Sequence, residues 1–177
     1  MTPSKEEAFA AIDDVIYAIE QCLAHHFFVG QAERILQSNG CPSALLIRNA
    51  TVESSLVFIR KMNEFFGTRK QRESDETLRA YHFGDFPHNG WFLEKQEYDE
   101  LHLYVAHVSV EGVRCGKKTW PLSDYAVRAA EKSRLFLVFL LESPSTPAEK
   151  KEKLKQCIAW ITSVLGVLRP MQGGRAE

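Results

Sequence analysis

Apolar residues along the chain follow the helical period in five segments. In the first, residues 4–38, apolar side chains recur at three- and four-residue steps, which is typical of one face of an amphipathic helix. Ser4 and Glu7 have the spacing of a capping box at its start, and Asn39-Gly40 is a stop signal. The apolar face consists of Phe9, Ile12, Ile16, Ile19 and Leu23.

Four further segments complete the predicted set of helices. Pro42 suits the first turn of the second segment, and Gly67 suits the position just past its end. Ser123 is expected to cap the fourth helix, and Thr146-Pro147 to open the fifth. The four segments cover residues 42–66, 94–109, 123–142 and 147–168.

Two places along these segments need interpretation. In the third segment, Leu101 and Val105 fit a helix, whereas Leu101, Leu103 and Val105 alternate as in a strand. The polar run EKQEYDE before them favours the helix. Gly30 is expected to divide the first segment in two, because glycine weakens a helix interior.

The pattern predicts an all-α fold, a single-domain antiparallel bundle of four to five helices. Helices joined by short turns pack antiparallel, and 177 residues are one domain's worth of chain. The bundle is expected to span residues 1–168, with residues 169–177 as a flexible C-terminal tail. The run LFLVFLL at residues 135–141 is apolar all round, so it is expected to lie in the core or in an oligomer interface.

Composition narrows the class of protein. Hydrophobic residues make up 45%, and 22 basic residues against 23 acidic ones give a net charge of −1, which excludes a strongly basic nucleic-acid binder. The longest apolar run is far shorter than the roughly 20 residues that span a bilayer, and the N-terminus does not resemble a secretory leader. The widely spaced cysteines predict reduced thiols in the cytoplasm. They are Cys22, Cys41, Cys115 and Cys157.

A polar loop of more than 20 residues follows Gly67 and ends near Gly90. Loops of this length are usually functional or disordered. A moderately basic cluster overlaps it, which is either a solvated surface or a contact for nucleic acid. The cluster consists of Arg60, Lys61, Arg69, Lys70 and Arg72.

The second helix carries a polar stripe. At 100° per residue, Asn49, Glu53, Arg60 and Asn63 fall within about 80° of one another, and the rest of the helix is mostly apolar. A helix with this pattern is expected to be central, with its stripe partly buried. The four residues then form either the polar wall of a ligand pocket or a structural network that fixes helix register.

Histidines offer a weaker hypothesis. His26 follows Cys22 by four residues and could share a helix face with it, but zinc needs further ligands. His25, His102 and His107 are the other candidates, and their spacing does not match a metal motif. We therefore predict neither a metal site nor a cofactor. His107, among apolar neighbours, is either a core histidine or an acid–base group.

Three stretches carry a family resemblance: RNATVESSLVFIRKMNEFFG, LHLYVAHVSV and KKTWPLSDYAV. In order and spacing, over roughly residues 40–142, they resemble uncharacterised prokaryotic helical-bundle proteins similar to the HEPN superfamily. That superfamily includes toxin and antiphage ribonucleases and many inactive scaffolds. The resemblance points to six positions: Asn49, Glu53, Arg60, Phe66, His107 and Trp120.

The chain departs from the ribonuclease motif of that superfamily. Active members use an arginine, a polar residue and, a few positions later, a histidine in one helix. Here Arg48-Asn49 is followed by Glu53 where that histidine would stand, and ribose chemistry needs an acid or base there. The resemblance therefore implies the fold more than an activity.

Two functions are expected from these observations. The first is a non-catalytic binding or interaction module, forming a homodimer or binding a protein partner. The alternative is a HEPN-like RNA-processing or nucleotide-binding enzyme, with Arg60 on a phosphate or carboxylate and Glu53 or His107 as base. Asn49, Asn63 and Trp120 are the candidate ligand-binding residues. Motifs of common enzyme families are not found in the sequence, so the module is the favoured function.

Overall fold

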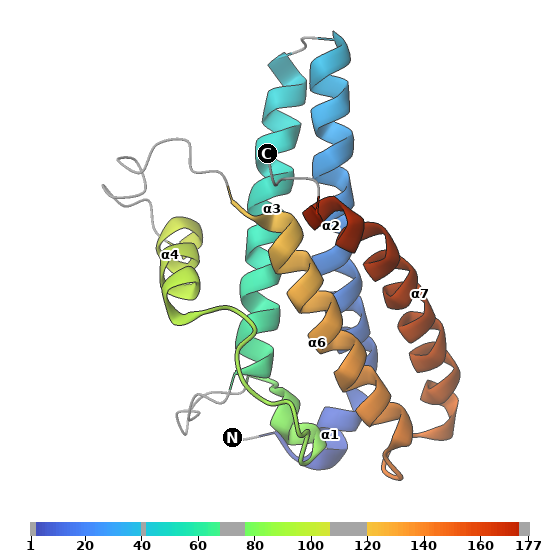
Figure 1. Ribbon diagram of the computed structural model, residues 1–177. Coiled ribbons are helices and arrows are strands. Elements are labelled where there is room, and N and C mark those ends of the chain that lie inside the picture. Colours follow the sequence, from blue (N-terminus) through green and yellow to red (C-terminus); the bar gives the residue numbers. More distant parts are fainter. Residues whose placement is uncertain (1–2, 40–41, 68–76, 107–119, 174–177) are drawn as a thin grey trace.

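The computed structural model describes residues 3–39, 42–67, 77–106 and 120–173 (Figure 1). Within these ranges the secondary structure is helical, without β-strands, which confirms the all-α class and decides the third segment as a helix. The elements are α1 (Lys5–Ala10), α2 (Ile12–Asn39), α3 (Pro42–Phe66), the short 3-10 helix η1 (Ala80–Phe83), α4 (Lys95–Ala106), α6 (Leu122–Glu142) and α7 (Ala148–Gly173).

Two antiparallel helical hairpins, α2–α3 and α6–α7, make up the bundle (Figure 1). Helix α6 contacts α2, α3 and α7, while α4 packs on α3 and α1 packs on η1. The end of the α2–α3 hairpin extends well past the ends of α6 and α7 (Figure 1). Within the described residues, no helix combines the length and apolar character needed to cross a membrane.

Several helix boundaries follow from local chemistry as predicted. The backbone N–H of Glu7 donates to Ser4 Oγ at 3.2 Å, and the backbone N–H of Ser4 donates to Glu7 Oε2 at 2.7 Å. This pair is the capping box at the start of α1. Helix α2 ends at Asn39, and α3 begins at Pro42 and ends at Phe66. Local capping signals therefore determine these boundaries.

Other boundaries differ from the prediction. The first segment breaks at Ala11 and continues unbroken through Gly30. The break at Ala11 lets α1 turn away from the axis of α2, so that the Phe9 ring packs edge-on against Phe83 at 5.5 Å. An exposed Gly30 is tolerated because its helix is held by tertiary packing.

The boundaries of the later helices also differ from the prediction. Pro121 occupies the N-cap of α6, one residue before Leu122, so Ser123 is not the cap. Thr146 is buried, and its hydroxyl donates back to the Leu140 carbonyl at the end of α6. Helix α7 continues to Gly173, past its expected end at residue 168.

The centre of the core is a cluster of phenylalanines around Phe136 on α6. Its ring meets Phe65 and Phe66 from α3 at centroid distances of 5.2 and 5.7 Å. Phe83 and Phe86, from the segment after α3, pack against it at 5.3 and 5.2 Å. All four contacts are edge-to-face, which is the arrangement that aromatic quadrupoles favour. Phe136 therefore joins α3, α6 and the connecting segment into one core.

The described part of the long loop, residues 77–94, is packed into the molecule. Phe83, Phe86 and Leu93 are buried. The segment closes the end of α3, because the backbone N–H of Gly90 donates to the Phe66 carbonyl at 2.8 Å. Gly67 permits the close approach of Trp91, since a Cβ at residue 67 would lie 2.1 Å from Trp91 Nε1. This part of the loop is structural.

The apolar end of α6 is covered by the chain itself. Phe136, Leu137 and Leu140 are fully buried, and Leu135, Phe139 and Leu141 are partly buried against the same core. Residues 135–141 are expected either in the core or in an oligomer interface, and the core of the single chain accounts for their apolar pattern. These residues are therefore not a reason to expect an oligomer interface.

Replacing Phe136 is expected to lower the free energy of unfolding by about 3–5 kcal/mol, because Phe136→Ala leaves a cavity between four rings. Val167→Ala, at a half-exposed position on α7, is the control and should change it by less than about 0.5 kcal/mol. Urea unfolding followed by circular dichroism measures both. Equal effects of the two substitutions would contradict the central role of Phe136.

Candidate functional site

The predicted polar stripe on α3 divides into an exposed half and a buried half. Asn49 and Glu53 are exposed, Arg60 is about one quarter exposed, and Asn63 is completely buried. The expectation of a partly buried stripe therefore holds for Arg60 and Asn63 and not for Asn49 and Glu53. The reason is that α3 is central only over its second half, because its first half lies in the extended hairpin (Figure 1).

Arg60 belongs to a network with Glu64 and Tyr98. Arg60 Nε donates to Glu64 Oε1 at 2.8 Å, and the Tyr98 hydroxyl donates to the same oxygen at 2.7 Å. Burial disfavours the charged form of Glu64, but the hydrogen bonds from Tyr98 and Arg60 outweigh it and lower the pKa of this carboxyl. Burial, together with the Glu64 carboxylate, raises the pKa of Tyr98. The Arg60 charge is thus neutralised within the fold.

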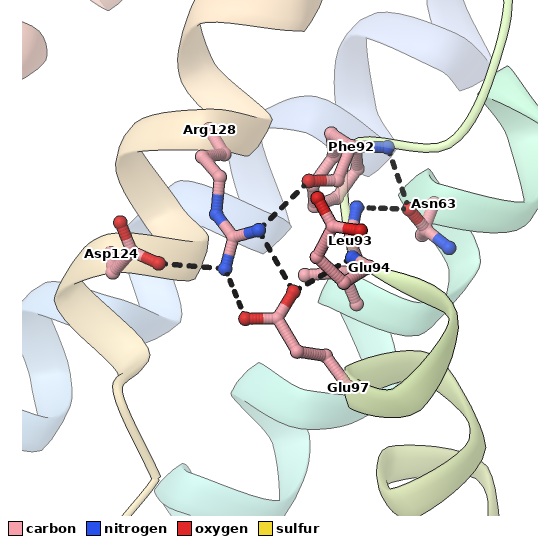
Figure 2. A network of polar contacts seen from close by, with 7 residues as sticks. All are labelled: Asn63, Phe92, Leu93, Glu94, Glu97, Asp124 and Arg128. Carbon is pink, nitrogen blue, oxygen red and sulfur yellow. Dashed lines mark hydrogen bonds and ion pairs between the residues drawn. The ribbon is translucent and has the colours of Figure 1, made fainter.

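Asn63 is the buried polar group of the stripe, and it organises the backbone. Its Oδ1 accepts hydrogen bonds from the backbone N–H groups of Phe92 and Leu93, both at 2.9 Å (Figure 2). These two donors would otherwise be buried without partners, which is costly. Asn63 therefore anchors the segment before α4 to α3, and its oxygen is not available to a ligand.

Arg128 on α6 is the centre of a second network (Figure 2). Its Nη1 and Nη2 donate to the two carboxylate oxygens of Glu97 on α4, at 2.8 and 2.7 Å. Nη2 also donates to Asp124 at 2.6 Å, and Nη1 to the Phe92 carbonyl at 3.1 Å. Glu97 in turn accepts from the backbone N–H of Glu94 at 2.8 Å, the start of α4. The fork of one guanidinium thus fixes α4 against α6.

Sequence reasoning did not single out this second network. Asp124 and Arg128 have a four-residue spacing that favours an ion pair on a helix, and this signal could have been used. Glu97 lies on a different helix, so its pairing with Arg128 has no local signature. The same holds for Tyr98, which reaches Glu64 on α3.

For the remaining candidates that the structure describes, the contacts found do not include Arg60. His107 lies outside the described residues, as do Arg69, Lys70 and Arg72 of the basic cluster. Trp120 is buried and packs on Tyr104 with ring centroids 5.2 Å apart. Phe66 is fully buried in the aromatic core.

His25, His26 and His102, the described candidates for metal ligands, each lie against an aromatic ring. His25 Nδ1 lies 2.7 Å from the Gln21 carbonyl, and its ring stacks on Phe58 at 5.1 Å. Burial lowers the pKa of His26. His102 lies on α4, where it stacks on Tyr98. In the part of the chain that is described, no three His, Cys, Asp or Glu side chains are arranged to hold a metal ion.

A shallow groove of about 690 Å³ lies between α1 and the turn before α7. Lys5, Phe9, Pro147 and Lys150 are among its lining residues. Lys150 is paired with Asp13 of α2, and Lys5 lies over the Phe9 ring at 5.8 Å. The described site residues do not line this groove, and its Lys150 is already paired within the fold.

Comparison of the chain with known protein families, with curated proteins and with solved structures finds no match.

Removing the Asn63 side chain is expected to lower the free energy of unfolding by about 2–4 kcal/mol in Asn63→Ala, because two buried backbone donors lose their acceptor. Asn49→Ala removes an exposed asparagine from the same helix and should cost less than about 0.5 kcal/mol. Chemical denaturation of both variants measures the difference. A cost below 1 kcal/mol for Asn63→Ala would contradict the anchoring role.

The Glu97 pairing predicts a pH dependence of stability. Hydrogen bonds from Arg128, only partly opposed by burial, lower the pKa of Glu97 below its ordinary value of 4.5. A lowered pKa in the folded state stabilises the fold above about pH 4.5, and this contribution is lost as the pH falls through the folded pKa.

Glu97→Gln is therefore expected to lower stability at neutral pH and to weaken its fall in acid. Glu94→Gln, an exposed glutamate three residues earlier, is the control and should follow the parent protein. Thermal melts between pH 7 and pH 3 test this. Parallel curves for Glu97→Gln and the parent would show that the pair does not contribute.

Proposed function

We propose that this chain is a non-catalytic interaction module that associates with another protein chain through its α2–α3 hairpin. The observation that supports this is where exposed large apolar side chains lie. Most of those in the described residues are on this hairpin, and the others are on α4 and α7. The hairpin residues are Tyr17, Phe28, Ile35, Leu46 and Ile47.

Exposed apolar side chains gathered on one element are unusual for a protein that acts alone, because large apolar patches on monomers generally mark interaction sites. We propose a homodimer as the assembly, since closed two-fold pairs are the commonest homo-oligomers.

A reducing cytoplasm is the compartment that this proposal implies. Burial raises the pKa of the Cys22 and Cys157 thiols to about 12, so both are unreactive. A prokaryotic source and a HEPN-like relationship belong to the same proposal, and they rest on the resemblance over roughly residues 40–142.

The surroundings of Arg60 argue against the enzyme alternative. A phosphate bound at Arg60 would compete with the Glu64 carboxylate, which lies 2.8 Å from Arg60 Nε. Glu53, the proposed base, is exposed and lies two turns before Arg60 along α3. The two groups would need a third residue to act on one substrate.

The proposal is tested by an RNA cleavage assay. The purified chain, Glu53→Ala and Arg60→Ala are each incubated with labelled single-stranded and hairpin RNA, with and without Mg²⁺. We expect no cleavage by any of the three. Cleavage by the parent protein that both variants lose would overturn the non-catalytic function. Equal cleavage by all three that persists through a second purification would overturn it as well, and would indicate a site that includes neither Glu53 nor Arg60.

A further inference from the structure

Helix α4 is attached to the side of the bundle. It packs on α3, outside the two helical hairpins (Figure 1). Of its side chains at residues 95–104, Tyr98 and Leu101 are buried, and the others are half-buried or exposed. Helix α6, in contrast, has buried side chains in every turn. Because the free energy of packing grows with the apolar area that is buried, apolar contacts hold α4 less firmly than they hold α6.

Two carboxylates tie α4 to its neighbours. Glu97 of α4 accepts hydrogen bonds from Arg128 Nη1 and Nη2 on α6, at 2.8 and 2.7 Å (Figure 2). Glu64 of α3 accepts a hydrogen bond from the Tyr98 hydroxyl of α4 at 2.7 Å. Hydrogen bonds to an ionised carboxylate are stronger than those between neutral groups. Both ties are therefore weakened when the carboxylate takes up a proton.

The segment before α4 is held in a different way. Asn63 Oδ1 accepts hydrogen bonds from the backbone N–H groups of Phe92 and Leu93, and Arg128 Nη1 donates to the Phe92 carbonyl (Figure 2). The acceptors are amide oxygens, which do not titrate in mild acid. The change from acid-resistant contacts to acid-sensitive ones therefore falls at Glu94, the residue before α4.

From these contacts we infer that α4 is a latched helix: when Glu64 and Glu97 take up protons, α4 leaves α3 and α6 as one unit, pivoting at Glu94, while the two hairpins stay folded. The inference does not depend on the proposed function. Proteins open in cooperative units, and opening one of them costs less free energy than unfolding the whole chain. We call Glu64 and Glu97 the latch carboxylates.

The surroundings of Glu97 allow it to release Arg128 in acid. Its ionisable neighbours on α6 are Arg128, Asp124 and Tyr125, and Glu100 lies near the same tyrosine from α4. Hydrogen bonds from Arg128, only partly opposed by burial, lower the pKa of Glu97. After Glu97 takes up a proton, the guanidinium keeps a second carboxylate, because Asp124 lies 2.6 Å from Nη2. Release of α4 therefore does not leave Arg128 without a carboxylate partner.

Glu64 has ionisable neighbours from three elements. Arg60 of α3 and Tyr98 of α4 donate hydrogen bonds to its carboxylate, and Arg79, from the segment before η1, donates to its backbone carbonyl. Burial disfavours the charged carboxylate, but the hydrogen bonds from Tyr98 and Arg60 outweigh it and lower the pKa of Glu64. His102 of α4 stacks on Tyr98, so this imidazole is a further ionisable group at the contact.

The two pKa shifts set the direction of the pH dependence. Both latch carboxylates have a lowered pKa in the folded chain, so both are ionised at neutral pH. Their contribution to the docking of α4 is complete above the ordinary pKa of 4.5 and is lost as the pH falls through the lowered values. Release of α4 is therefore expected in acid and not near neutral pH.

The test is hydrogen–deuterium exchange of the full chain, followed by mass spectrometry of peptides that cover α4 and α6. Exchange is measured between pH 6 and pH 3.5, and each rate is divided by the intrinsic exchange rate at that pH. We expect the protection of α4 to fall about tenfold or more over this range. The protection of α6 should be retained.

Glu97→Gln and Glu64→Gln are each expected to lower the protection of α4 at pH 6 and to reduce its further fall in acid, because the amide does not take up a proton. Asp99→Asn is the matched control, since the Asp99 carboxylate pairs with Lys95 inside α4 at 3.0 Å. This variant should follow the parent protein, and so should His102→Gln. Circular dichroism checks that every variant folds.

Protection that falls together in α4 and α6 at every pH would overturn the inference, because the whole chain would then be unfolding. Protection of α4 that is unchanged down to pH 3.5 would overturn it as well. The inference also fails if both glutamine variants follow the parent protein, or if Asp99→Asn or His102→Gln removes the response to acid.

Discussion

The contact between Phe136 and four surrounding phenylalanine rings is the interaction on which the rest of the structure depends. It is the point where α3, α6 and the segment between α3 and α4 meet. Edge-to-face pairs add about 0.5–1.5 kcal/mol each to the burial of apolar area. The two helical hairpins also meet where α6 and α7 contact α2, and there Lys153 of α7 pairs with Asp13 of α2 at 2.9 Å.

Charged residues fix α4 to the helices that the aromatic core joins. Arg128 fixes α4 to α6 through Glu97, and Glu64 fixes α4 to α3 through Tyr98. Arg60, one of the residues predicted for a site, belongs to the network that aligns α3 and α4. Among the described residues, most of the large apolar side chains that the core leaves exposed are on the α2–α3 hairpin.

Local signals in the sequence predicted where most helices begin and end. Tertiary contacts determined which residues are exposed and which side chains pair. The capping box of Ser4 and the turn signals at Pro42 and Gly67 act within a few residues, so they could be read directly from the sequence. The exposure of Asn49 and Glu53 could not be read from the sequence, because it depends on where α6 ends relative to α3. The pairing of Glu97 with Arg128 spans 31 residues, and hydrophobic periodicity carries no information about it.

The position of Phe136 has a consequence for the order of folding. Each hairpin joins helices that are neighbours in sequence, and such local contacts close quickly. The contact of Phe66 with Phe136 must instead close a long stretch of chain, which also carries Phe83 and Phe86. We therefore expect the two hairpins to form first and the aromatic cluster to join them in the slower step. The connecting segment then acts as part of the folding nucleus rather than as a passive link.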